Sequence, residues 1–229
     1  MATDDLPNLP FPLVLASASP RRRELLSLLR VPFEVRPVDI VEDVSGGLRA
    51  DVLARKLARE KAEAARLIDT ESPILAADTI VVHDGEVLGK PRDAEEARAM
   101  LRRLRGESHV VVTGVAVMPA GKRSVLARQP VTDVRMRRYS DAEIEASIAR
   151  GDPFDKAGAY AIQDPLLAPV ASYEAGSGMA RGCYCNVMGL PLWPLLEVLA
   201  KAGIDVGHVR AEDLLPECAG CPLRGRNNK

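Results

Sequence analysis

Two repeating patterns of apolar and polar positions run along this chain. Some stretches are short and nearly all apolar, which is typical of buried strands, whereas others place apolar residues every three or four positions, which is typical of amphipathic helices. The two kinds of stretch alternate through most of the sequence, so the pattern predicts an α/β fold. Predicted strands cover 13–16, 31–41, 73–83, 86–88, 109–118 and 125–136, and predicted helices cover 20–29, 48–68, 93–105, 140–151 and 189–199.

The same pattern predicts three segments. Residues 1–12 are acidic and proline-containing and are expected to form a loose leader, residues 13–203 an α/β domain, and residues 204–229 a tail with a cysteine pair. The chain of 229 residues is long enough for one large α/β domain, or for two lobes that share a sheet.

Composition and charge exclude several classes of partner. The chain is 47% hydrophobic and 28% charged with a net charge of −1, which is typical of a soluble globular protein. A protein that neutralises many phosphates usually carries a basic excess, so no nucleic-acid partner is expected. The sequence has neither a signal sequence nor an apolar run of about 18 residues, so we expect no membrane association and a cytoplasmic location.

The stretch Leu13–Leu29 changes from a strand pattern to a helix pattern across a short polar turn. Ser19 is a favoured N-cap, and the proline after it suits a first helical position. Arginines fill the first helical turn, where the macrodipole disfavours them by roughly 0.3–1 kcal/mol each, and a bound phosphate would reverse that penalty. The alternative is a surface helix with its arginines in solvent. Candidate oxyanion ligands are the N–H groups of the turn and the side chains of Ser17, Ser19, Arg21 and Arg22.

A carboxylate interrupts the most apolar strand. Asp78 and Thr79 lie inside the run from 73 to 83, which otherwise reads as a central strand buried on both faces. A buried carboxylate is costly unless it is paired, metal-bound or at the rim of a cleft, so Asp78 is a candidate site residue. The alternative is a structural hydrogen bond. Lys61, on the helix predicted before this strand, is by itself more typical of a solvated face.

The segment Gly85–Pro91 superficially resembles a Walker A loop. It is one residue too short, and Pro91 stands where the Mg²⁺-binding serine or threonine belongs, so a P-loop ATPase is disfavoured. Lys90, at the end of a predicted strand, remains a candidate phosphate contact.

A polar, glycine-containing connection covers 151–163. It holds the pair Asp155 and Lys156, which we expect to be buried, and Gln163, which is expected to emerge from an apolar strand. Taken alone, the segment is also compatible with a structural turn.

Five motifs, in the same order, resemble those of the Maf family of nucleoside triphosphate pyrophosphatases over roughly residues 13 to 202. The resemblance implies a mixed α/β fold of the Maf and ITPase type, with an extended central sheet, two lobes around a nucleotide cleft and usually a homodimer. It also implies hydrolysis of a nucleoside triphosphate to the monophosphate and pyrophosphate with a divalent metal, Mg²⁺ or Mn²⁺. The motifs are Ser17-Ala-Ser-Pro-Arg-Arg22, Ala77-Asp-Thr-Ile-Val81, Gly89-Lys-Pro91, Asp155-Lys-Ala-Gly-Ala-Tyr160 with Ile162-Gln163, and Gly189-Leu-Pro-Leu192.

The resemblance assigns roles to these residues. Asp78 would be the general base or a metal ligand, and Glu42 would complete the carboxylate set. Attack of water on an α-phosphorus needs an activated water and neutralised phosphate charge, which this set of residues supplies. The cations that would hold phosphate oxygens are Arg22, Lys61 and Lys90, together with the turn from Ser17 to Arg21. Lys61 and Lys90 would thereby act with Asp78 in catalysis, and Lys156 would be a further substrate-binding residue.

Three positions resemble the branch of the family that acts on dTTP and UTP: Arg21, Thr79 and Gln163. A branch that prefers 7-methyl-GTP has a bulky aromatic residue in place of that arginine, as suits stacking on a cationic purine. A glutamine amide offers both a donor and an acceptor to the O4/N3 edge of uracil or thymine. The alternative is that Gln163 merely satisfies backbone groups at the end of a strand.

Four cysteines depart from the family pattern. Cys183 and Cys185 stand where the family more often has serines, and Cys218 and Cys221 lie in the tail. A C-x-C plus a C-x-x-C supplies enough thiolates for a structural zinc site, although the spacings are not those of a common zinc finger. Free thiols remain an alternative, and disulfides are disfavoured because nothing indicates an oxidising compartment.

A regulator of cell division that binds nucleotides with little turnover is the alternative function, because the family is associated with septum formation. A pure binder has no need of a carboxylate such as Asp78 beside a triphosphate, where the two would repel each other unless a metal intervened.

Overall fold

A mixed β-sheet forms the centre of the protein. The computed structural model describes residues 11–43, 47–170, 180–207, 209–210 and 213–224. Its eight strands run in the order β2-β1-β3-β5-β7-β8, with β4 paired to β3 and β6 paired to β5. This confirms the predicted α/β class with a mixed central sheet. The strands are β1 Leu13–Leu15, β2 Phe33–Val35, β3 Ile74–His83, β4 Glu86–Leu88, β5 Ser108–Met118, β6 Leu126–Arg128, β7 Val131–Arg135 and β8 Ala180–Arg181.

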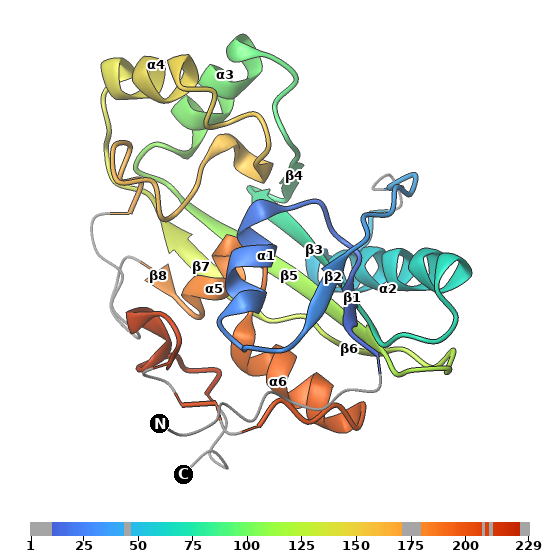
Figure 1. The fold of residues 1–229 in the computed structure, drawn as a ribbon. Coiled ribbons are helices and arrows are strands. Elements are labelled where there is room, and N and C mark those ends of the chain that lie inside the picture. The colour runs from blue at the N-terminus through green and yellow to red at the C-terminus, as the bar shows by residue number, and fades with distance from the viewer. Residues whose placement is uncertain (1–10, 44–46, 171–179, 208, 211–212, 225–229) are drawn as a thin grey trace.

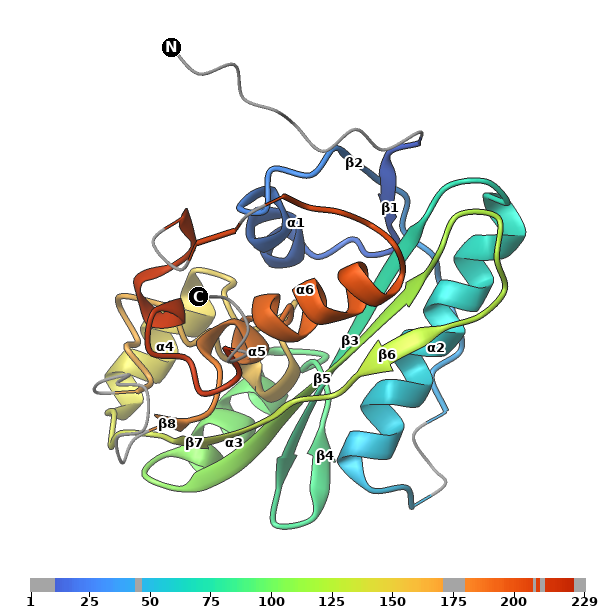
Figure 2. The ribbon, with the colours of Figure 1, turned by 90° about the horizontal axis from the view of Figure 1, so that it is seen from below.

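Helices cover both faces of this sheet. Figures 1 and 2 show α2 against one face, α1, α5 and α6 against the other, and α3 and α4 together at one end. A hydrophobic cluster lies beneath each layer, and a further one joins α3 and α4 to the ends of β3, β5 and β7. The helices are α1 Pro20–Ser27, α2 Ala50–Ile68, α3 Ala94–Leu104, α4 Asp141–Ala149, α5 Tyr184–Met188 and α6 Leu192–Lys201, with 3-10 turns η1 Ala157–Ala159 and η3 Pro216–Cys218.

The long apolar runs become the two central strands. β3 and β5 pair antiparallel over nine positions, from Ile74 opposite Met118 to Val82 opposite Val110. Helix α2 packs so closely on this pair that a Cβ added at Gly114 would lie 2.1 Å from the carbonyl oxygen of Ala54. Glycine at this position therefore allows the helix to approach the sheet.

Local signals define the helix starts. Ser19 caps α1 and a proline follows it, as predicted. At α4, the side chain of Ser140 accepts from the N–H of Glu143, whose carboxylate in turn accepts from the Ser140 N–H. This reciprocal capping box stabilises the start of α4 without tertiary contacts.

Three predicted strands differ from the structure. The run predicted at 31–41 forms a strand only at Phe33–Val35. The run 125–136 is divided into β6 and β7 around Pro130, because proline has no N–H for the ladder. The predicted strand before Gln163 is absent: the chain there forms η1 and turns, and Gly158 and Ala159 have φ of +72° and +63°, which no strand contains. The leader predicted at 1–12 lies outside the described residues except for Phe11 and Pro12.

Candidate functional site

A cavity of about 700 Å³ opens where β1 ends, between the sheet, α1, α5 and η1. That volume is in the range of small-molecule sites. Every predicted site residue other than the cysteines lines this one cavity: Ser17, Ser19, Arg21, Arg22, Glu42, Lys61, Asp78, Thr79, Lys90, Lys156 and Gln163.

Strand topology places the first two motifs together. β1 and β3 are parallel neighbours, with Leu15 opposite Leu75. β1 ends there and leads into the turn at Ser17, while β3 continues to Asp78 and Thr79. Successive side chains of a strand point to opposite faces, so Asp78 faces the α2 side and Thr79 faces the α1 side. The cavity reaches both because it lies beyond the end of β1.

On the α2 side, two carboxylates meet one ammonium group. The Nζ of Lys61 contacts the Asp78 carboxylate directly and lies 2.7 Å from Oε1 of Glu42. The Lys61 side chain is only 14% exposed. The interpretation of Lys61 as part of a solvated face is therefore wrong, because the packing of α2 on β3 turns this residue inward.

Burial dominates the protonation equilibrium of Asp78. It raises the pKa of this carboxyl, and the nearby cations Lys61 and Arg22 offset only part of the shift. A carboxylate with a raised pKa is a better proton acceptor than an ordinary aspartate once it is ionised. Asp78 therefore has the properties of a general base at the edge of a cavity.

On the α1 side, the guanidinium of Arg22 connects three elements. Its Nη1 donates to Oγ of Ser17 at 3.0 Å, its Nη2 to Oγ1 of Thr79 at 3.1 Å, and its Nε to the carbonyl of Gly189 at 2.9 Å. Burial lowers the pKa of Arg22, while Asp78 raises it. The alternative of solvated arginines is thus wrong for Arg22, whereas Arg23 is exposed.

Arg21 lies at the rim and pairs with the segment before η1. Its Nη1 donates to Oδ2 of Asp155 at 2.8 Å, and Asp155 Oδ1 accepts from Nζ of Lys156 at 2.5 Å. Although burial acts to raise it, Lys156 and Arg21 hold the pKa of Asp155 below its usual value. The expectation of a buried pair is wrong: Lys156 is half-buried and Asp155 is exposed, at 53%, because the carboxylate reaches the surface to meet Arg21.

Two further features define the other end of the cavity. Oε1 of Gln163 is buried without a hydrogen-bond partner. The alternative in which this amide satisfies neighbouring backbone groups therefore does not account for its oxygen, which makes no hydrogen bond to them. Lys90 is exposed where the chain leaves β4.

The arrangement suits a divalent ion only in part. Among the described residues, no group of three or more His, Cys, Asp or Glu is placed to hold a metal by itself. Asp78 and Glu42 do converge on one point, now taken by the ammonium of Lys61. Mg²⁺ is commonly held by one or two carboxylates together with substrate phosphates and water, so these two residues fit an ion that arrives with a phosphorylated ligand.

The geometry has the parts expected of a site for phosphorylated ligands, and comparison with known proteins agrees. The family profile described as Maf-like protein matches residues 12–202. The chain belongs to the Maf family.

Relatives in this family share most of their length with the chain. The dTTP/UTP pyrophosphatase of Thermomicrobium roseum is 50% identical over 212 residues, which cover 92% of this chain and 93% of the relative. The dTTP/UTP pyrophosphatase of Chromobacterium violaceum is 46% identical and covers 85% and 96%. A solved HAM1 protein from Coxiella burnetii is 21% identical, with a TM-score of 0.42 over 56% of this chain and 74% of that one.

Sequence reasoning missed several supporting residues of this Maf site. The Gly189 carbonyl binds Arg22, and at a φ of +105° a Cβ at Gly189 would lie 3.2 Å from Oγ1 of Thr79. Thr79 Oγ1 also lies 3.0 Å from Oγ1 of Thr113, which donates to the Asn186 carbonyl at 2.7 Å. Asn186, a polar residue in the otherwise apolar run 183–187, was the sequence feature that could have indicated these contacts, because a buried asparagine side chain needs several hydrogen-bond partners.

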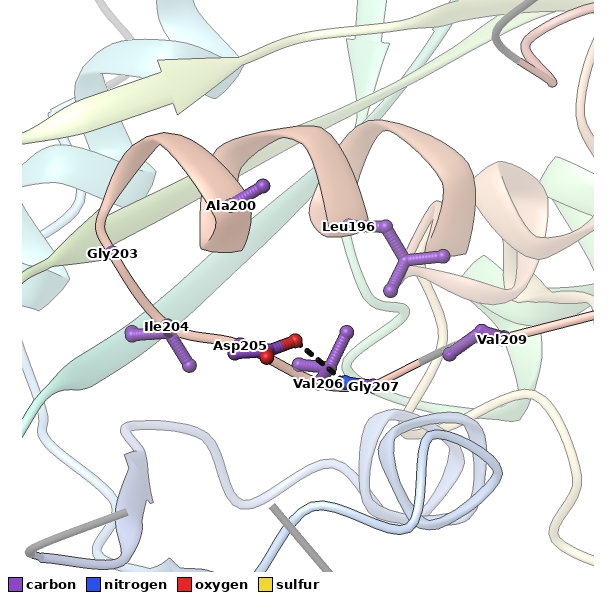
Figure 3. A pocket seen from close by; sticks show the side chains of 8 residues that line it. All are labelled: Leu196, Ala200, Gly203, Ile204, Asp205, Val206, Gly207 and Val209. Carbon is purple, nitrogen blue, oxygen red and sulfur yellow. Dashed lines mark hydrogen bonds between the residues drawn. The ribbon is translucent and has the colours of Figure 1, made fainter. Parts of the chain in front are cut away.

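A second cavity, of about 410 Å³, lies beside α6 (Figure 3). Leu196, Ile204 and Val209 supply apolar walls, and the charged side chain on its lining, Asp205, accepts from the Gly207 N–H at 2.8 Å. It lacks the converging cations of the larger cavity. The described residues contain no helix long and apolar enough to span a bilayer.

Proposed function

We propose that this protein hydrolyses nucleoside triphosphates, with dTTP and UTP preferred, to the monophosphate and pyrophosphate. The observation that carries the proposal is a buried carboxylate, Asp78, in one cavity with the guanidinium of Arg22 and the ammonium groups of Lys61 and Lys90. Relatives of up to 50% identity over 92% of the chain carry the name dTTP/UTP pyrophosphatase, which supports the same activity here.

The cations bind and orient the triphosphate. Arg22 is held rigidly by Ser17, Thr79 and Gly189, so little side-chain entropy is lost when it contacts a phosphate oxygen. The start of α1 adds N–H groups and the positive end of the helix dipole. Lys90, exposed at the rim, reaches the outer phosphates.

Asp78 accepts the proton of the attacking water. The water oxygen bonds to the α-phosphorus, the bond between that phosphorus and the bridging oxygen breaks, and pyrophosphate leaves with the electron pair. Lys61 holds the Asp78 carboxylate in place and neutralises part of the growing charge. Asp78 and Glu42 are also the residues that would hold Mg²⁺ or Mn²⁺, which would supply further charge neutralisation on the phosphate oxygens.

The side-chain amide of Gln163, whose oxygen has no hydrogen-bond partner within the protein, recognises the base. It would accept the N3–H of uracil or thymine, while the amide N–H₂ would donate to O4. Cytosine reverses this pattern and would leave buried polar groups unpaired, at a cost of about 1–3 kcal/mol. Arg21, pinned to Asp155 at the mouth of the cavity, leaves no aromatic platform there for a cationic purine.

Pyrophosphate release tests the activity. With UTP and Mg²⁺, the wild-type protein is expected to release pyrophosphate, and Asp78→Asn is expected to lose about 10²- to 10⁴-fold in kcat, the usual effect of removing a general base. Asp133→Asn, on the exposed face of β7, is the matched control and should keep full activity. UTP binding to the wild type without turnover would instead support the alternative function, a regulator of cell division whose site binds a nucleotide without hydrolysing it.

A nucleotide panel tests base recognition. We expect kcat/KM for UTP and dTTP to exceed that for CTP at least about tenfold, or about 1.4 kcal/mol, and Gln163→Ala to abolish most of the difference. Gln129→Ala, between β6 and β7 and outside the cavity lining, should leave the preference unchanged. Equal turnover of CTP and UTP by the wild type contradicts the role of Gln163 but leaves the pyrophosphatase activity intact.

We also propose a homodimer, which rests on the family resemblance, and a cytoplasmic location, which rests on the sequence pattern. Sedimentation at several protein concentrations tests the first, and cell fractionation tests the second.

A further inference from the structure

Four cysteines from two distant segments meet in the core, on the side of the sheet that carries α5 and α6. Cys183 and Cys185 stand at the start of α5, and Cys218 and Cys221 stand at and after η3. Their residues are between 0% and 5% exposed. Because the chain contains only four cysteines, the whole thiol content of the protein is gathered in this cluster.

The four side chains form a continuous series of contacts. Sγ of Cys185 lies 3.3 Å from Sγ of Cys218. The Cys183 side chain interacts with those of both Cys185 and Cys221. The two segments therefore meet through two thiol pairs, Cys185 with Cys218 and Cys183 with Cys221. The interaction between Cys183 and Cys185 links these two pairs.

We propose that this cluster is a structural zinc site with four cysteine ligands, independent of the triphosphate site. The donor set is that of a closed tetrahedral Zn²⁺ centre, and two segments with a C-x-C and a C-x-x-C supply it. The four thiols would each lose a proton to solvent on binding one Zn²⁺, and no electron is transferred.

The cluster as described is slightly too compact for an ion. As the side chains stand, no group of three or more His, Cys, Asp or Glu among the described residues could hold a metal ion. With Zn–S bonds of about 2.3 Å, tetrahedral geometry requires S···S distances of about 3.8 Å. The Cys185 and Cys218 sulfurs would therefore separate by about 0.5 Å, a movement that rotation of the side chains allows.

The site would join the C-terminal segment to the functional cavity. Trp193 Nε1 donates to the Cys218 carbonyl at 3.2 Å, and Leu214 and Ile204 pack in the same hydrophobic cluster as the thiols. On the other side, α5 carries Asn186, whose side chain binds the Thr113 N–H at 3.0 Å, and ends at Gly189, which binds Arg22. Zinc would thus stabilise the helix that forms one wall of the cavity.

Metal analysis of the full-length protein tests the proposal. Untagged protein, purified under reducing conditions without added metal, is expected to contain about one zinc per chain. Displacement of the metal by Co²⁺ should give the thiolate charge-transfer bands of a tetrahedral tetrathiolate centre. A reduced chain that neither carries zinc nor takes up added Zn²⁺ overturns the proposal, as does a mass deficit of two hydrogens per bridge that reveals disulfides.

Two variants distinguish zinc binding by the cysteines from simple packing of these residues in the core. Cys221→Ser is expected to lose most of the zinc, whereas Trp193→Phe, which removes the hydrogen bond to Cys218 and alters the ring under Arg224 but removes no thiol, should retain it. Trp193 is the single tryptophan, so its fluorescence in the wild type reports on the cluster. Stripping zinc with a mercurial and a chelator should shift its emission to longer wavelength, and re-addition of Zn²⁺ after reduction should reverse the shift. Unchanged zinc content in Cys221→Ser overturns the assignment of that ligand set.

Discussion

His109 is expected to make the free energy of unfolding fall as the pH is lowered. The residue lies on β5, is 3% exposed, and its Nε2 is 2.6 Å from the hydroxyl of Tyr160. Its Nδ1 is buried without a hydrogen-bond partner. Burial, together with the nearby His83, lowers the pKa of His109 from 6.5 to about 4. The folded protein therefore holds this imidazole neutral in a pH range where an exposed histidine is charged.

The sign of the effect follows from proton linkage. Because the folded-state pKa is the lower one, the unfolded chain binds the proton first, and stability is lost as pH falls from 6.5 towards 4. The gap between the unfolded and folded pKa corresponds to about 3 kcal/mol when the transition is complete. Most of this loss, about 2–3 kcal/mol, falls between about pH 7 and about pH 4.5.

Urea unfolding at a series of pH values measures this loss. His109→Gln keeps groups that can hydrogen-bond to the Tyr160 hydroxyl but does not titrate. Its free energy of unfolding should fall less steeply with acid than that of the wild type, and the difference should reach about 2–3 kcal/mol at about pH 4.5. The other titratable groups are present in both proteins, so the difference between the two curves reports on His109 together with its interaction with His83. Parallel stability curves for the two proteins would refute the reasoning.

Two further predictions concern Arg22 and Gly114. Arg22→Ala should lower kcat/KM for UTP about 10- to 100-fold through both kcat and KM, because its charge-assisted contacts strengthen as phosphate charge grows. Steady-state kinetics checks this, with the exposed Arg23→Ala as the control, and a change in melting temperature alone contradicts it. Gly114→Ala should destabilise the fold by about 1–3 kcal/mol or more, because the new Cβ meets the Ala54 carbonyl. Thermal unfolding checks this against Gly89→Ala, where a Cβ has open space, and equal melting temperatures contradict it.

Local sequence signals were sufficient for most of the elements. The apolar run through β3 predicted a central strand within one residue at its start, because a strand buried on both faces admits few polar residues. Ser19 with the proline after it predicted the start of α1, and the turn at Asp84 predicted the β3–β4 hairpin. These signals act within a few residues and need no tertiary partner.

The sequence failed where long-range contacts override local preference. The segment before Gln163 reads as an apolar strand but turns at Gly158, which has a positive φ, and the residues before the turn contact Arg21 on a distant helix through Asp155. Lys61 reads as a surface lysine, since nothing within its own helix reveals that Asp78 on the next strand will face it.

The residues of the site could therefore be predicted from short stretches of sequence, whereas the contacts between distant stretches could not. The sequence alone determined which groups are present: the capped arginine turn, the carboxylate within a strand and the four thiols. Only the tertiary structure decided which groups meet, because β1 ends beside Asp78, α2 supplies Lys61 and the chain after α6 returns Cys218 to Cys185. The physical reason is that burial and pairing energies depend on separation in space, and the strand order sets that separation.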